Sequence, residues 1–426
     1  MLGRCASSVG VCAVLLVSST ASAQQLRRPS RGLHDGATVD LTALNYYYNR
    51  DFRSGDGPGQ RTEWAQGVLI QAKSGWTPGA LGLGLDVLGV ADVKMDGTAD
   101  EVGIGLLQAD PGGVRRAYGR VGLTGRARVG ETVLRVGTLI PKEPVLTAST
   151  SRIMPQTFKG VALSSGDVGA LEVSLARYSR TWYRDGVGNQ PLTVFNKNGR
   201  FQATPAADHF DVVTVSRAWG KTKATLQSGQ LQGIYRQDMV GLDSLVPVPE
   251  GRLQVEARWF RTHDVGGAMA GPIDNRMLNA LVSYKRGAHD YAVGLQRLSG
   301  PSAMPWVNGT DGGVFNWTFI NDFLEAGETS WQGRYTLDGN QAGLPGWTFM
   351  ARYVRGTGAH PASTLGEGRE WQRDLQVEYR FQRPTLRRFS ISWLNGTMRS
   401  SYQRDAEENR LILRYDWRLQ QPQSSP

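Results

Sequence analysis

Apolar and polar residues alternate along many short runs of this 426-residue chain, and this alternation limits the fold more than any other feature. Successive side chains of a β-strand point to opposite faces, so each such run predicts a strand with one apolar and one polar face. The runs with this pattern are 252–259, 330–337, 374–381, 388–393 and 410–419. After residue 23, no helical periodicity persists over about 11 residues. The sequence therefore predicts an all-β protein.

Composition leaves two kinds of β-protein open. The chain is 40% hydrophobic with a mean hydropathy of −0.35, and after its N-terminal segment it has no apolar run of the ~18 residues that a membrane helix needs. A soluble sandwich could turn the polar faces to water, whereas a membrane barrel would turn the apolar faces to lipid. The apolar faces often end in Trp or Tyr, which favour the boundary between lipid and water.

Chain length and the spacing of loops favour the barrel. If residues 1–23 are removed, 426 − 23 = 403 residues remain, and at roughly 45 residues per hairpin they form about 18 strands. Short turns are expected at 75–79, 286–290 and 383–385, and longer polar connections at 51–62, 92–116, 182–209, 300–328 and 356–369. The prediction is a transmembrane antiparallel β-barrel with short turns at one rim and long loops at the other.

The N-terminus has the features of an export signal. Arg4 precedes an apolar segment at 9–17, and Ala21-Ser22-Ala23 forms a small-residue cleavage site. Both cysteines, Cys5 and Cys12, lie within this segment, so the mature chain is expected to form no disulfide and no thiolate metal site. The predicted division is a signal peptide at 1–23, a lead-in at 24–37, the barrel at 38–419 and a tail at 420–426.

One long connection, 135–160, contains three prolines. Pro141, Pro144 and Pro155 each fix φ near −65° and lack a backbone donor, so most of this segment is unsuited to a sheet interior. Either an ordinary surface loop or a stiff loop folded into the barrel would fit. In a barrel, the inward alternative predicts a constriction.

Several short motifs together resemble the OprD-type outer-membrane porins. They are NYYYNRDF at 45–52, EWAQG at 63–67, LIPK at 139–142, PQTF at 155–158, DNR at 274–276, NGTD at 308–311, NDF at 321–323 and EENRL at 407–411. The resemblance implies one 18-stranded channel per chain in the outer membrane of a Gram-negative bacterium, taking up small carboxylate-bearing nutrients. Such barrels usually end on an aromatic residue, whereas here the tail 420–426 follows Leu419.

The basic balance of the chain agrees with this resemblance. Net charge is +10 and the sequence pI is about 9.7. Arginines in the inward phase could bind carboxylates bidentately along a lumen, although each could instead be paired with a nearby acid. These arginines are Arg126, Arg128, Arg135, Arg258, Arg334, Arg352, Arg380, Arg388, Arg410, Arg414 and Arg418.

The resemblance also implies where the passage narrows. It places the constriction at the loop 139–159, opposite a later loop at about 305–328, which could supply an acidic wall. The residues expected at the constriction are Lys142, Glu143, Arg152, Asp311, Asp322 and Glu325.

Three functions other than transport are compatible with a β-rich exported chain: a hydrolase, a nucleic-acid binder and an adhesin. A barrel hydrolase has no H-E-x-x-H or G-x-S-x-G motif to support it, and a nucleic-acid binder would cluster its basic residues instead of alternating them with apolar ones. An adhesin would need exposed loops but no conducting lumen. The expectation is therefore a porin without metal or cofactor, a monomer or weak trimer. Its expected partners are small carboxylates, outer-membrane lipid, lipopolysaccharide and the barrel-assembly machinery, with no nucleic acid.

Overall fold

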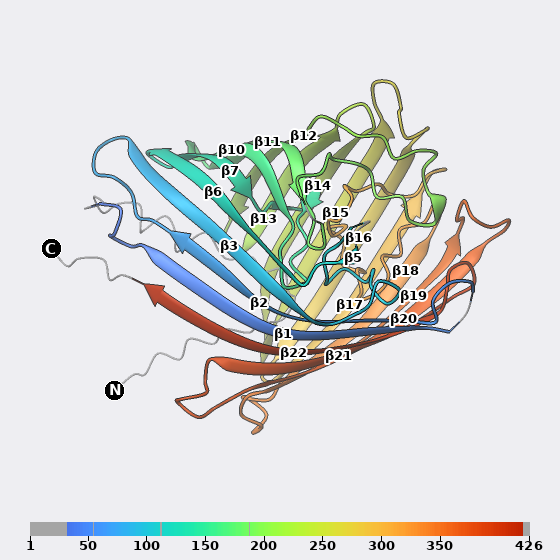
Figure 1. Cartoon of the computed structure of the whole chain (residues 1–426). Coiled ribbons are helices and arrows are strands. Elements are labelled where there is room, and N and C mark those ends of the chain that lie inside the picture. Colours follow the sequence, from blue (N-terminus) through green and yellow to red (C-terminus); the bar gives the residue numbers. More distant parts are fainter. Residues whose placement is uncertain (1–31, 54, 111–112, 187, 421–426) are drawn as a thin grey trace.

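The computed structural model describes residues 32–420 except 54, 111, 112 and 187. Eighteen strands form one antiparallel sheet, which confirms the predicted barrel. Figure 1 shows the strands wrapped around a common interior. They are β1 (Thr38–Phe52), β2 (Gln60–Lys73), β3 (Gly82–Asp96), β6 (Ala117–Val129), β7 (Thr132–Leu139), β10 (Thr157–Val168), β11 (Leu171–Trp182), β12 (Phe210–Trp219), β13 (Thr222–Leu231), β14 (Tyr235–Val248), β15 (Gly251–Asp264), β16 (Asp274–Arg286), β17 (His289–Ser299), β18 (Thr329–Asp338), β19 (Trp347–Ala359), β20 (Gly368–Arg380), β21 (Phe389–Ser400) and β22 (Ala406–Gln420). The predicted signal peptide and residues 421–426 of the predicted tail lie outside the described residues.

The sheet closes on itself because its first and last strands pair. β1 and β22 are in register from Thr38 opposite Gln420 to Phe52 opposite Ala406. A closed sheet has no edge strand, so its backbone donors and acceptors are satisfied between neighbouring strands, as lipid requires. Among the described residues, no helix is both long and apolar enough to cross a membrane.

Side chains along β22 alternate as the sequence predicted. Leu411 and Leu413 point outward and are 46% and 41% exposed, whereas Glu408 and Arg410 point inward and are buried. The apolar outer face meets lipid, and the polar inner face lines the lumen.

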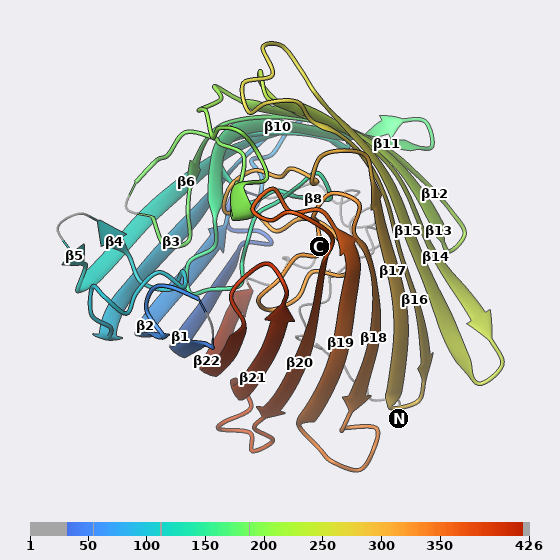
Figure 2. The ribbon, with the colours of Figure 1, turned by 90° about the vertical axis from the view of Figure 1, so that its right-hand side faces the viewer.

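The two rims differ in the length of their connections. Five of the turns at one rim, 130–131, 169–170, 220–221, 249–250 and 287–288, contain two residues each, whereas the connections 97–116, 140–156, 183–209 and 300–328 leave the other rim. In bacterial barrels the short turns face the periplasm and the long loops face the outside. Figure 2 shows the wall from β14 to β22 curving around an interior that other segments of the chain enter.

The inward loop is shorter than the sequence predicted. Residues 140–156 leave the large sheet, and within them β8 (Lys142–Glu143) pairs only with β9 (Leu146–Thr147). Thr157, Phe158 and Lys159 belong to β10 and pair with β11, so their assignment to the loop was wrong. The last proline is Pro155, and the residues after it keep the backbone donors that a sheet needs.

Replacing Leu413 or Ile391 with Arg should reduce the free energy of unfolding by about 2–4 kcal/mol, because both side chains face lipid and oppose each other in the register. Ser392→Lys should reduce the free energy of unfolding far less, since Ser392 faces the lumen and contacts Glu378. Refolding titrations into lipid vesicles would measure both. Equal losses for the two faces would contradict the assigned orientation.

Candidate functional site

The connection 140–156 crosses the barrel interior. On one side, the backbone N–H of Val145 donates to Gln227 Oε1 of β13 at 3.0 Å. On the other, the Arg152 guanidinium donates to the Tyr48 hydroxyl of β1 at 3.1 Å. β1 and β13 stand almost opposite each other in the circle of eighteen strands. The loop therefore spans the lumen and divides it.

Two glycines in the wall give this loop the space that it needs. A Cβ atom at Gly67 of β2 would overlap the side chain of Ile153, and one at Gly229 of β13 would overlap Val145. Both loop residues are buried. A glycine inside a strand often marks the close approach of another segment, and both positions follow that rule.

Two further connections join the inward loop and make one compact plug. The backbone N–H of Asp311 donates to the Thr147 carbonyl at 2.9 Å, which links 300–328 to 140–156. The backbone N–H of Asn308 donates to the Thr193 carbonyl at 2.8 Å, which links 300–328 to 183–209. Gln156 Nε2 also donates to the Asn308 carbonyl at 3.0 Å. The three connections support one another across the lumen.

A buried ion cluster holds two of these connections together. Arg200 lies 2.7 Å from Asp322 and 2.9 Å from Glu325, and Lys197 lies 3.3 Å from Asp322. Burial opposes ionisation of Asp322, but the attraction of Arg200 and Lys197 outweighs it and lowers its pKa to about 2. Asp322 and Glu325 therefore face packed protein. The expectation that they line an acidic wall does not hold, because buried carboxylates need paired cations.

The other predicted constriction residues lie on or beside the inward loop. Lys142 is exposed, and Glu143 and Asp311 are half-buried. Burial raises the pKa of Asp311, while Arg184 and Arg152 oppose that rise. Among the described residues, no group of three or more His, Cys, Asp or Glu side chains could hold a metal ion.

Three guanidinium groups gather around one tyrosine at the inward loop. The Tyr48 hydroxyl donates to Glu408 Oε2 at 2.7 Å, and it accepts from Arg50 at 2.8 Å and from Arg152 at 3.1 Å. Arg410 pairs with Glu408, and its guanidinium lies 4.8 Å from the centre of the Tyr48 ring. Arg50 and Arg410 both pair with Glu408, whereas Arg152 is linked to this carboxylate only through the Tyr48 hydroxyl. The Tyr48 cluster, defined as Tyr48, Arg50, Arg152, Glu408 and Arg410, therefore has an excess of positive charge.

Ten of the eleven arginines predicted along the lumen lie on inward strand faces. Arg388 does not, because β21 begins only at Phe389 and Arg388 is exposed in the preceding turn. Six of the ten form ion pairs, which are Arg126–Asp86, Arg352–Asp374, Arg380–Glu378, Arg410–Glu408, Arg414–Asp416 and Arg418–Asp40. Much of the positive charge of the wall is thus balanced by neighbouring acids.

Three inward arginines also hold the connection 300–328 against the wall. Each donates to a backbone carbonyl of the segment 313–319, with the pairs Arg258 to Gly313 at 2.6 Å, Arg352 to Trp317 at 2.8 Å and Arg410 to Phe319 at 2.9 Å. The guanidinium of Arg258 also lies 4.5 Å from the centre of the Phe315 ring. A planar cation can hydrogen-bond in its plane while it stacks on an aromatic face.

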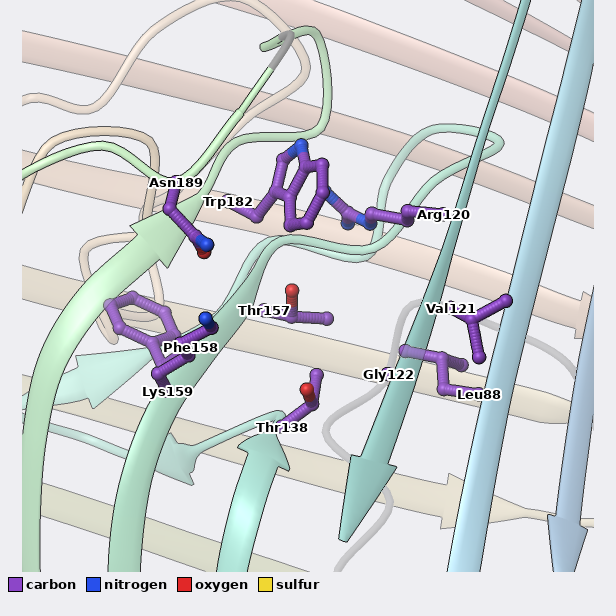
Figure 3. A pocket seen from close by; sticks show the side chains of 10 residues that line it. All are labelled: Leu88, Arg120, Val121, Gly122, Thr138, Thr157, Phe158, Lys159, Trp182 and Asn189. Atoms are coloured by element: carbon purple, nitrogen blue, oxygen red, sulfur yellow. The ribbon is translucent and has the colours of Figure 1, made fainter.

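The wall has a pocket where β7 ends and the chain turns inward. The β6–β7 register stops at Thr124, so the outer half of β6 has only β3 as a strand partner within the described chain. Figure 3 shows Arg120 of β6 extending beside Trp182 of β11, with 5.1 Å between the guanidinium and the ring centre. Arg120 also donates to the carbonyls of Pro155 and Tyr183. Side chains thus close the wall where strand pairing stops.

Several residues of the site were missed from sequence. Arg50 and Arg120 share the inward phase of β1 and β6, so alternation could have found them. Arg184, which donates to Ser149 Oγ at 2.7 Å, and Arg200 lie in the connection 183–209. That connection has no regular period, so its sequence carried no orientation signal.

Deleting residues 143–153 should raise single-channel conductance and weaken ion selectivity, because this segment divides the lumen. Deleting 362–366, which are exposed in the connection 360–367, should leave both properties unchanged. Planar-bilayer recordings of folded protein would compare the two deletions. Unchanged conductance after the first would show that the loop does not limit the passage.

The Asp322 pair should stabilise the plug at neutral pH and weaken only under strong acid. The carboxyl pKa falls from 3.8 to about 2 on folding, so pairing contributes about 2 kcal/mol above pH ~4, and this contribution is lost as pH falls through ~2. Urea unfolding of wild type and Asp322→Asn at pH 7, 4 and 2.5 would test this. A difference between the two proteins that stays constant over this range would contradict the assigned titration.

Comparison with known proteins agrees with this architecture. Residues 31–419 match the model of the family described as outer membrane porin, OprD family. The porin-like protein GalP of Pseudomonas putida is 31% identical over 401 residues, which cover 93% of this chain and 95% of that protein. The Pseudomonas aeruginosa structures of OccK9 (OpdG) and of OpdK with vanillate have TM-scores of 0.87 and 0.85, with 35% and 32% identity, and each alignment covers 91% of this chain and all of the other. With its closed barrel and its inward loop, this chain belongs to the OprD family of outer-membrane porins.

Proposed function

We propose that this porin takes up small carboxylate-bearing solutes by passive diffusion through its lumen. The observation that carries the proposal is the Tyr48 cluster, in which Arg50 and Arg410 pair with one carboxylate, Glu408, and Arg152 donates to the Tyr48 hydroxyl beside it. Because guanidinium groups stay charged at physiological pH, the excess charge attracts anions. Arg152 and Arg410 are buried, whereas the Arg50 side chain is 20% exposed, so a solute carboxylate would reach the cluster at Arg50.

A track of accessible arginines supports onward transfer toward the periplasm. Arg414 and Arg418 follow Arg410 on the inward face of β22, and their side chains are 47% and 67% exposed. Arg380 of β20 lies two strands away, since it opposes Ser390, which opposes Arg414. Each arginine pairs with an acid, but exposed pairs contribute only about 0–1 kcal/mol. A passing carboxylate could therefore compete for them.

The spacing of this track implies stepwise movement. Arg410 and Arg414 are four positions apart, which corresponds to about 13 Å along a strand. A small solute cannot bridge that distance, so it would release one arginine before it reaches the next. Weak and repeated binding suits transport, because a solute that binds tightly leaves slowly. Arg258 and Arg352 hold the connection 300–328, so we assign them to the shape of the passage.

One solved relative supports the proposed substrate class. OpdK, 32% identical to this chain, was crystallised with vanillate, a carboxylate. The half-buried Phe319 ring beside Arg410 would suit an aromatic acid, and organic acids or amino acids are the alternatives within the class.

Export and assembly follow from the same proposal. Residues 1–23 would direct the chain across the inner membrane, and the barrel-assembly machinery would insert it into the outer membrane. Each barrel encloses its own passage, so a monomer or a weak trimer would function equally well. OprD-family members are channels, which leaves an adhesin as the remaining alternative. An adhesin need not conduct in planar bilayers, whereas a porin must.

Replacing Arg380 and Arg414 with Gln should shift the reversal potential away from anions and slow carboxylate uptake. The change removes charge but keeps bulk and hydrogen bonding, so uncharged solutes of similar size should pass as before. The effect should shrink at high salt, because the Debye length falls from ~10 Å at 0.1 M to ~3 Å at 1 M. Bilayer recordings and liposome swelling would measure both properties.

A matched control replaces Arg177 and Arg236 with Gln. These arginines are exposed on the outer face, where they pair with Asp211 and Asp238. The control removes the same charge outside the lumen and should leave selectivity unchanged. An unaltered anion preference in the R380Q/R414Q protein at low salt would rule out the arginine track.

A further inference from the structure

The outer surface carries a second set of arginines, separate from the lumen. Arg261 of β15 and Arg276 of β16 stand directly opposite each other in the register. Arg297 of β17 lies one step away, opposite Leu278. All three side chains are exposed, and their neighbours along each strand are buried on the inward face: Phe260, Thr262, Asn275, Met277, Gln296 and Leu298. The three arginines, here called the outer triad, therefore face away from the lumen.

No member of the outer triad forms an ion pair within the described chain. Asp238 of β14 stands opposite Arg261 in the register but pairs with Arg236, and no ion pair is found for the exposed Asp274 near Arg276. Outward Arg177, by contrast, pairs with Asp211. Like charges directly opposite on a sheet destabilise it. An external anion bound between Arg261 and Arg276 would remove this repulsion.

The surface below the outer triad is apolar. The next outward residues toward the periplasmic turns are Trp259, Leu278 and Leu295, which are 42%, 44% and 44% exposed. Cations at the loop end above apolar side chains match a lipid with an anionic headgroup above its acyl chains. Because the loop end faces the outside, the matching lipid belongs to the outer leaflet.

Further arginines extend this basic surface around the barrel. The register runs from Arg297 through Thr329 and Thr357 to Arg369 of β20. Below this row of residues, toward the periplasmic turns, Arg355 lies one outward position away and Arg373 two. Arg355, Arg369 and Arg373 are exposed, and none of them forms an ion pair in the described chain. Together with the outer triad, these arginines extend the basic surface from β15 to β20.

We propose that the outer triad binds the phosphate groups of a phosphorylated glycolipid of the outer leaflet, of the lipid A type. Guanidinium groups bind phosphate oxygens bidentately, and two of them across adjacent strands can grip one phosphate. The acyl chains lie along Trp259, Leu278 and Leu295. This site is independent of the solute path, because it occupies the opposite face of the same strands.

The test uses full-length mature porin in detergent with purified bisphosphorylated lipid A. Native mass spectrometry counts bound lipid, and a dephosphorylated lipid A serves as the probe without charge. Wild-type protein should retain the phosphorylated lipid and release the dephosphorylated one. Each arginine near a charged lipid surface contributes about fivefold in affinity, so R261Q/R276Q should bind about 25-fold more weakly.

The control protein is R177Q/R286Q, which loses two outward arginines paired with Asp211 and Glu250. Arg236 is kept, because its partner Asp238 stands opposite Arg261. The control should keep wild-type lipid affinity, and both variants should keep wild-type conductance, because neither change touches the lumen. Equal binding of the phosphorylated and dephosphorylated lipids by wild-type protein would overturn the proposal, and this comparison needs no variant to fold. Wild-type affinity in R261Q/R276Q would overturn it as well. Loss of anion selectivity in the R380Q/R414Q protein would leave this result unaffected, so the two proposals fail separately.

Discussion

The pairing of β1 with β22 is the contact on which the rest of the structure depends. Lipid offers no hydrogen bonds, so a sheet can cross a membrane only if its last strand pairs with its first, as β22 pairs with β1. Closing eighteen strands makes a ring too wide for wall side chains to fill. Selectivity must therefore come from segments that fold inward, and the connections 140–156, 183–209 and 300–328 meet this need.

Inward segments create a second requirement. Their backbone N–H and C=O groups leave water without joining the sheet, so they need other hydrogen-bond partners. Here wall arginines satisfy part of that demand, as Arg258, Arg352 and Arg410 donate to carbonyls of 313–319. The ion cluster of Arg200, Asp322 and Glu325 adds a fixed link between two connections. A basic lumen is therefore partly structural. Only the arginines that keep access to the passage, such as Arg50 in the Tyr48 cluster, Arg414 and Arg418, are available to a solute.

The same residue type has different roles on the two faces of the barrel. Inside, most arginines pair with acids or carbonyls, and the Tyr48 cluster keeps an excess of cations beside the inward loop. Outside, the outer triad is exposed and forms no ion pair within the described chain, and it is the surface that we propose binds lipid. Under the two proposals, the position of an arginine relative to the sheet, and not the residue type, separates solute recognition from lipid recognition.

The sequence by itself determined the strands and the face on which each side chain lies, because a period of two is a local property that needs no knowledge of neighbours. It placed ten arginines on inward faces and missed Arg388 by only one residue, since β21 begins at Phe389. Only the tertiary structure decided which arginines are free. Arg418 meets Asp40 across the closure of the barrel, and Arg352 meets Asp374 across β19 and β20. It also decided that Asp322 and Glu325 are buried with Arg200, since irregular loops have no period and contacts across 120 residues depend on how the whole ring closes.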